Sequence, residues 1–292
     1  RMWPGIFMGA FLANFYVSSS LTLSLVIAIG NTLEALAAGY IILHFASSNP
    51  FSRTYETAIF ILALFASTMI SASIGVGSLF FTGIISHEDF SLLWKTWWIG
   101  DLVGALVVTP FLLTWFRLPF GRFTKKQTAE AAGLFIITLC VLGNVFAQWQ
   151  LFDISEELVI FSLLPILAWS ALRFHHYGAT LIVIVISTAA IIGTLNGFGP
   201  FVLGTENESL IAIQAYMGAA VFTALLLMAT QEERRLAYQE VHINKEDLEA
   251  TVTTRTNELD RTNELLSKEM LQQKHLTDSL KTLLHHIDRS SS

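Results

Sequence analysis

Long apolar segments constrain the fold of this chain more than any other feature. They lie at residues 3–16, 21–45, 56–82, 95–116, 128–149, 158–172, 179–195 and 210–230. A helix needs about 20 apolar residues to cross the hydrocarbon core of a bilayer. The pattern therefore predicts an all-α fold, a polytopic transmembrane bundle of about eight spans. The first, sixth and seventh segments are short, so any of them could be re-entrant rather than fully spanning.

Charged residues divide the chain into regions with different surroundings. Only 14% of the residues are charged, and most of these follow Gln231, whereas a soluble domain carries about 25%. We therefore expect an integral-membrane domain at 1–230 and a polar helix at 231–289. No basic stripe of the kind that binds phosphates is present, which argues against a nucleic-acid partner.

The charges between the apolar segments predict the orientation. Basic residues fall in every second loop, at Arg1, Arg53, Arg117, Arg122, Lys125, Lys126, Arg173, Arg234 and Arg235. The other loops hold one basic residue, Lys95, and the acidic residues Glu88, Asp89, Asp153, Glu156, Glu157, Glu206 and Glu208. Because short cytoplasmic loops are enriched in Lys and Arg, we expect a multi-pass membrane protein with a cytoplasmic C-terminus.

The polar C-terminal region is predicted to be one long helix, because it has no Gly or Pro from Gln231 to Ile287. A heptad places Leu259 and Leu266 at d and Asn263 at a. A polar a residue fixes register and a two-stranded state at some cost in stability. The pattern favours a marginal parallel homodimer, and a solvated helix without a partner is the alternative.

Two acidic residues, Glu34 and Asp101, lie inside predicted spans, where a charge is costly and usually functional. Asn31 shares a helix face with Glu34, so this pair could make a polar helix–helix contact or could sense a ligand or a proton. Asp101 lies about 9 Å below Lys95 along its helix. Trp97 and Trp98 precede it and could form an interfacial aromatic belt or pocket walls.

Three amides are expected at a depth similar to that of Asp101: Asn144, Gln148 and Gln214. Together with Asp101 they could line a pocket open to the outside. Buried Glu34 and Asp101 would also suit the path of a transporter or channel. The long tail helix argues against a transporter or channel, whereas ion or solute flux in proteoliposomes would support one.

No motif in the sequence predicts catalysis. A P-loop, a Gly-rich nucleotide loop, a nucleophile elbow and an HExxH motif are all missing from the sequence. Cys140 is the single cysteine, and the pair His175–His176 has no nearby Cys or carboxylate, so we expect no metal and no cofactor. We assign no catalytic residue and no catalytic domain to this segment.

Several spaced motifs resemble the membrane-associated sensor domains of the first MASE class, over roughly residues 1–230. They are Trp3-Pro4-Gly5, Gly30-Asn31-Thr32-Leu33-Glu34-Ala35, Ser71-Ala72 with Gly75, and Trp94 to Trp98 with Gly100-Asp101. Such domains form the input end of bacterial histidine kinases and diguanylate cyclases. In this family we expect a further hydrophobic segment before the Trp-Pro-Gly motif, so the sensor is expected to be truncated at its start.

The tail at 231–289 looks like the signalling coiled coil of such receptors, at Arg255 to Leu259 and Thr262 to Leu266. The end of the sequence, at 290–292, resembles the start of a missing output or PAS domain. The resemblance implies a sensory input domain in the bacterial inner membrane. This domain would relay an external or membrane stimulus through a dimeric helix, with an unknown small ligand or a membrane protein as partner. A histidine kinase is the first expectation for the whole receptor. A diguanylate cyclase or phosphodiesterase is the alternative, and a His-Glu-Leu-Arg-Thr-Pro box or a GGDEF motif in the output region would decide.

Overall fold

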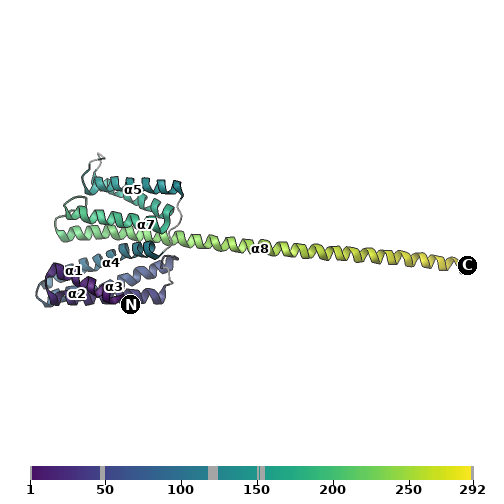
Figure 1. Ribbon diagram of the computed structural model, residues 1–292, viewed down its shortest axis with the longest axis horizontal. Helices are drawn as coiled ribbons and strands as arrows, with labels where there is room; N and C mark the ends of the chain where they lie inside the picture. The colour runs from purple at the N-terminus through teal and green to yellow at the C-terminus, as the bar shows by residue number, and fades with distance from the viewer. Residues whose placement is uncertain (1, 47–49, 118–123, 150, 152–154, 291–292) are drawn as a thin grey trace. The chain divides into compact units, whose positions relative to one another are not determined.

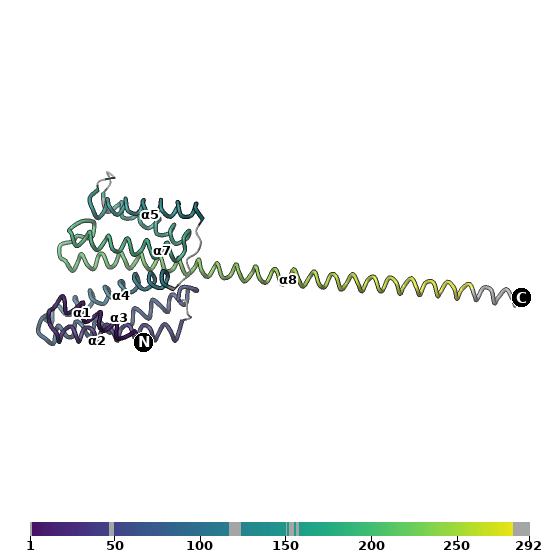
Figure 2. The backbone as a smooth tube through the Cα atoms, in the orientation of Figure 1, coloured from purple at the N-terminus to yellow at the C-terminus, as the bar shows by residue number. Residues whose placement is uncertain are grey.

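The computed structural model describes residues 2–46, 50–117, 124–149, 151 and 155–290 (Figures 1 and 2). Its helices are α1 (Trp3–Ser18), α2 (Leu21–Phe45), α3 (Thr54–Phe81), α4 (His87–Arg117), α5 (Lys125–Phe146), α6 (Glu156–Val159), the 3₁₀ turn η1 (Ile160–Ser162), α7 (Leu163–Leu195) and α8 (Glu206–Ser290). No strand occurs in these ranges. The expected all-α fold is confirmed.

The chain divides into two compact units, Arg1–Arg234 and Arg235–Ser292. α8 contributes the last apolar segment of the first unit and forms the second. Among the described residues, six helical stretches are long and apolar enough to cross a membrane: α2, α3, α4, α5, the stretch Ile160–Leu195, and α8. α1 has 16 residues and is shorter than these. The chain is thus a multi-pass membrane protein.

The expected sixth and seventh segments, 158–172 and 179–195, lie largely within the single helix α7. They are joined without a loop at His175, whose φ of 52° and ψ of −139° are not helical. A Cβ on Gly178 would lie 2.9 Å from the carbonyl oxygen of Ser170. In a straight helix, eight residues are separated by about 12 Å along the axis. The chain therefore reverses at His175, and two helical arms pack against each other.

Neighbouring helices in the first unit pack in the order α1, α2, α3, α4, α7 and α5. Figure 1 shows α1 to α3 on one side of α4, and α5 and α7 on the other. The start of α8 also lies against α4, because Thr96 donates a hydrogen bond of 2.7 Å to Asn207. Large side chains such as Phe60, Leu167, Ile186 and Leu225 are fully buried between these helices.

The bundle has two ends of opposite charge. At the basic end, α3 begins after Arg53, α5 begins at Lys125, and α7 reverses beside Arg173. At the acidic end, α4 begins beside Glu88 and α8 begins at Glu206. We call these the basic end and the acidic end below. Three of the loop charges used for orientation, Arg1, Arg122 and Asp153, lie outside the described residues.

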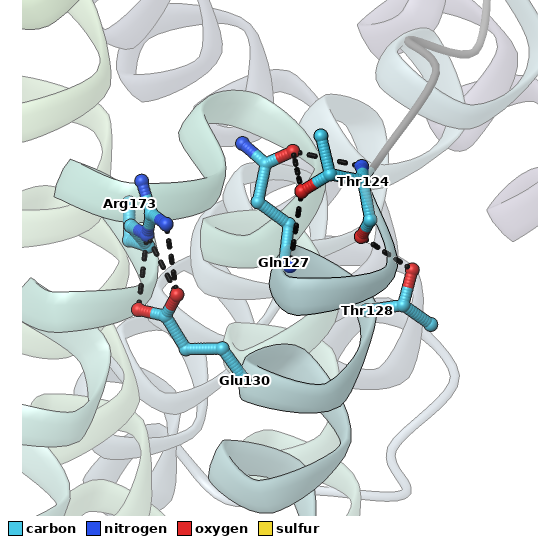
Figure 3. Close-up of polar contacts among 5 residues, drawn as sticks. All are labelled: Thr124, Gln127, Thr128, Glu130 and Arg173. Carbon is cyan, nitrogen blue, oxygen red and sulfur yellow. Dashed lines mark hydrogen bonds and ion pairs between the residues drawn. The ribbon is translucent and has the colours of Figure 1, made fainter.

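Local contacts explain how the helices begin and end at the basic end (Figure 3). Thr124 and Gln127 form a reciprocal capping box, which satisfies backbone N–H groups at the start of α5. One turn further on, the Nε of Arg173 in α7 donates to both carboxylate oxygens of Glu130, each at 2.9 Å. This forked contact ties α5 to the reversal in α7.

α8 is held at the same end by two acidic residues that follow its apolar segment. The hydroxyl and backbone N–H of Thr54, at the start of α3, both donate to the carboxylate of Glu233, at 2.6 and 3.3 Å. The Nε2 of His176 lies 3.7 Å from a carboxylate oxygen of Glu232. The end of the last span therefore contacts both α3 and the reversal in α7.

Candidate functional site

Ser71 joins three helices near the middle of their apolar stretches. Its side chain lies on α3 and is 1% exposed. The Oγ of Ser71 lies 2.7 Å from the Oδ1 of Asn31 on α2 and 2.9 Å from an oxygen of Asp101 on α4. We call Asn31, Glu34, Ser71, Trp97 and Asp101 the polar cluster.

Glu34 completes this group from the helix turn that follows Asn31. Its carboxyl group interacts with the hydroxyl of Ser71 and with the charge of Asp101. Within the described residues, no Lys, Arg or His forms an ion pair with either carboxyl group. Two acidic side chains thus lie together in an apolar bundle without a basic partner.

The polar cluster has more hydrogen-bond acceptors than donors. The serine hydroxyl has a single proton, and two carboxyl groups and the Asn31 oxygen surround it. If the Asn31 amide were turned to donate to Ser71, that one proton would still serve only one of the two carboxyl groups. The indole N–H of Trp97 supplies a second donor, to Asp101. A further donor, either a proton held by a carboxyl group or a hydrogen-bonding ligand, would complete the arrangement.

Trp97 is positioned by a close approach to α3. A Cβ on Gly75 would lie only 2.8 Å from Cζ2 of the indole, so glycine is required for this packing. The neighbouring tryptophans also contact α3: Trp94 donates to the Oγ of Ser73, and Trp98 donates to the carbonyl of Phe65, both at 3.2 Å. Trp98 also packs edge-on against the ring of Phe65, with centroids 4.8 Å apart.

The three amides expected around Asp101 lie elsewhere in the bundle. Gln214 on α8 donates to the carbonyl of Thr96 at 3.3 Å, and its side chain lies against Gly100. Asn144 is buried on α5, which packs against α7. Gln148 follows α5 with a positive φ of 54° and is exposed. The structure therefore brings Asp101 together with Asn31, Glu34 and Trp97, and places the amides of Gln214, Asn144 and Gln148 outside this cluster.

Ser71 was not predicted from the sequence as a site residue. The available signal was the small-residue motif Ser71-Ala72 with Gly75, which marks a face that neighbouring helices approach closely. In the second unit, Leu259 and Leu266 are 65% and 51% exposed on the single helix described. Asn263 lies between them and is also exposed.

The described residues contain no group of three His, Cys, Asp or Glu side chains that could hold a metal ion. The polar cluster offers two carboxyl groups, an amide and a hydroxyl, which suit the binding of a proton or of a hydrogen-bonding molecule.

A model of the MASE1 family matches residues 1–235, which is most of the chain and all of the first unit. The chain belongs to the MASE1 family. MASE1 is a membrane-associated sensor domain found in histidine kinases and diguanylate cyclases. No curated protein and no solved structure matches this sequence. In this MASE1 domain, the motifs that carried the resemblance place Asn31, Glu34, Ser71, Trp97 and Asp101 in one cluster.

Proposed function

We propose that this MASE1 domain is the sensory input of a histidine kinase in a bacterial inner membrane, and that the polar cluster is its switching site. The observation that supports this proposal best is the single hydroxyl of Ser71, which lies between Asn31 on α2 and Asp101 on α4. A stimulus that adds or removes a donor there would change which helices are joined.

In this proposal the helices of the polar cluster adopt two arrangements. Glu34 and Asp101 are half-buried in the bundle. Carboxyl groups without a basic partner are stabilised by hydrogen bonds there, and the loss of such a hydrogen bond in an apolar environment is costly. A proton or ligand that binds one arrangement better shifts the population toward it by its differential affinity. In this proposal the stimulus reaches the cluster from the outer side of the membrane.

The output of the cluster would be a rotation, tilt or register change of α8. α8 is one helix that contains both the last apolar segment and the polar tail. α4, which carries Asp101, contacts α8 through Thr96 and Asn207. We propose that two copies of the tail associate in parallel through Leu259, Asn263 and Leu266, with the tail in the cytoplasm.

A diguanylate cyclase or phosphodiesterase remains the second candidate for the output, because MASE1 domains are found in diguanylate cyclases as well as in histidine kinases. A transporter would also use buried carboxyl groups. Proton or solute flux in proteoliposomes tests that alternative.

The experiment compares two serines on the same helix in the full-length receptor. Ser71→Ala removes the hydroxyl that joins Asn31 and Asp101, whereas Ser67→Ala removes a hydroxyl that donates to the carbonyl of Leu64 in its own helix. We expect both variants to insert and fold, and only Ser71→Ala to lock the output on or off.

Asp101→Asn and Glu34→Gln test the carboxyl groups in the same receptor. Both changes keep the size of the side chain and remove the ionisable group. We expect Asp101→Asn to give normal membrane abundance and melting temperature but a fixed output. A normal stimulus response would refute the switching role, and loss of folded protein would show that Asp101 supports the bundle instead.

A further inference from the structure

A small cavity lies near the basic end, outside the polar cluster. It has a volume of about 130 Å³ and is bounded by α4, α5 and both arms of α7. Its walls are mostly apolar and include Leu134 and Phe135 of α5 and Leu181 and Ile182 of α7. An apolar wall with few polar groups is typical of sites for small organic ligands.

Three residues of this wall carry side-chain polar groups: Trp115, Ser170 and Tyr177. Ser170 is the most deeply buried hydroxyl among them. It is 1% exposed, and its Oγ has no hydrogen-bond partner among the described residues. Two buried hydroxyls close to it, those of Thr138 and Thr180, each donate to the carbonyl four residues earlier, at 2.8 and 2.7 Å, whereas the hydroxyl of Thr114, which is not part of the wall, also has no partner among the described residues. Because an unpaired buried hydroxyl is unfavourable, the unpaired group points to a ligand.

The reversal in α7 explains why Ser170 lies in the wall of the cavity. Gly178 on the second arm packs directly on Ser170 of the first, since a Cβ there would lie 2.6 Å from its Oγ. The indole N–H of Trp115 in the wall donates instead to the Oγ1 of Thr180, at 3.3 Å. Ser170 is therefore the fully buried hydroxyl in this wall that has no partner among the described residues and can accept or donate a hydrogen bond.

The size of the cavity limits what it can hold. An engineered apolar cavity of about 150 Å³ in another protein binds benzene and stays free of water. A water molecule needs two to four polar partners, and this wall offers one unpaired polar atom in the described residues.

We propose that the cavity binds a small aromatic or comparably compact apolar molecule with one hydrogen-bonding group, which pairs with the hydroxyl of Ser170. The hydroxyl distinguishes such a molecule from an unsubstituted hydrocarbon of the same shape. A bound molecule would contact Phe174 and Tyr177, which flank the reversal at His175.

The test uses phenol and benzene, which differ by one hydroxyl. Each is titrated calorimetrically into the whole chain in lipid nanodiscs, with the heats of empty nanodiscs subtracted. We expect phenol to bind about fivefold to tenfold more tightly than benzene, as one net hydrogen bond allows. Ser170→Ala should remove this preference and leave benzene binding unchanged, while Ser67→Ala, in α3, should keep it.

A second variant tests the space rather than the hydroxyl. Ala131→Phe fills the cavity from α5 and should abolish the binding of both phenol and benzene. If the Ala131→Phe variant does not fold, the smaller substitution Ala131→Leu is used instead. The proposal is overturned if phenol does not bind the folded protein, if its preference survives Ser170→Ala, or if binding survives the filled cavity. The last result would indicate dissolution in lipid. These binding measurements do not require a signalling output, so their results are independent of the proposed function.

Discussion

Replacing Gly75 with alanine should displace Trp97 from α3. The new Cβ would lie 2.8, 3.0 and 3.2 Å from Cζ2, Cη2 and Cε2 of the indole. Three contacts with one rigid ring cannot be relieved by a small rotation, and overpacking of this kind costs about 1–3 kcal/mol. Alanine also gains about 1 kcal/mol in helix propensity over glycine. The steric cost is therefore measured by comparing Gly75→Ala with the same substitution at a second glycine.

Gly77 is the matched control, because it lies on the same helix and a Cβ there would have nothing within 4 Å. Gly77→Ala should be neutral or stabilising, and Gly75→Ala should be about 1–3 kcal/mol less stable than Gly77→Ala. The free energy of unfolding is measured by denaturant titration in mixed micelles.

Trp97→Phe provides the complementary test. Phenylalanine lacks the part of the indole that the new Cβ would meet, so Gly75→Ala should cost much less in a Trp97→Phe background. Equal stability of the two alanine variants, or an unchanged cost of Gly75→Ala after Trp97→Phe, would show that the indole does not pack on Gly75.

Three further predictions concern topology, assembly and the α7 reversal. In a background without the native cysteine, Asp89→Cys should react with an impermeant thiol reagent from outside intact cells and Lys126→Cys should not; the reverse result would invert the orientation. Leu259→Cys should crosslink to its counterpart in membranes, and absence of a crosslinked dimer would argue against the parallel tail. Gly178→Ala should lower the free energy of unfolding by about 1–3 kcal/mol or more, because backbone as well as side chain blocks its Cβ, whereas Gly133→Ala, with open space around it, should not.

The sequence predicted the helices well because lipid imposes a simple rule. A segment that crosses the bilayer must be apolar over a fixed length and must satisfy its backbone internally. The bounds of α2 coincide with the apolar segment at 21–45. The reversal in α7 was predicted less well: the sequence indicated two segments on either side of Arg173, but not a junction without a loop at His175.

The polar cluster was only partly predictable. Asn31 and Glu34 were expected to share a helix face, and depth along the helix placed Asp101 inside the membrane. The direction of Asp101 around its helix was not predictable, because it depends on which neighbour packs on which face. Successive residues differ by about 100° around the axis, so Gly100 contacts Gln214 of α8 while Asp101 contacts Ser71 of α3.

Because α8 is one continuous helix, the number of residues in its tail sets the direction in which the end of the tail faces. From Gln231 to Ile287 it contains no Gly or Pro that would let the helix bend. Each inserted residue turns everything beyond it by about 100°, so two added residues reverse the facing of the tail and seven nearly restore it. A receptor built on this helix would accept output domains only at certain spacings, repeating about every seven residues.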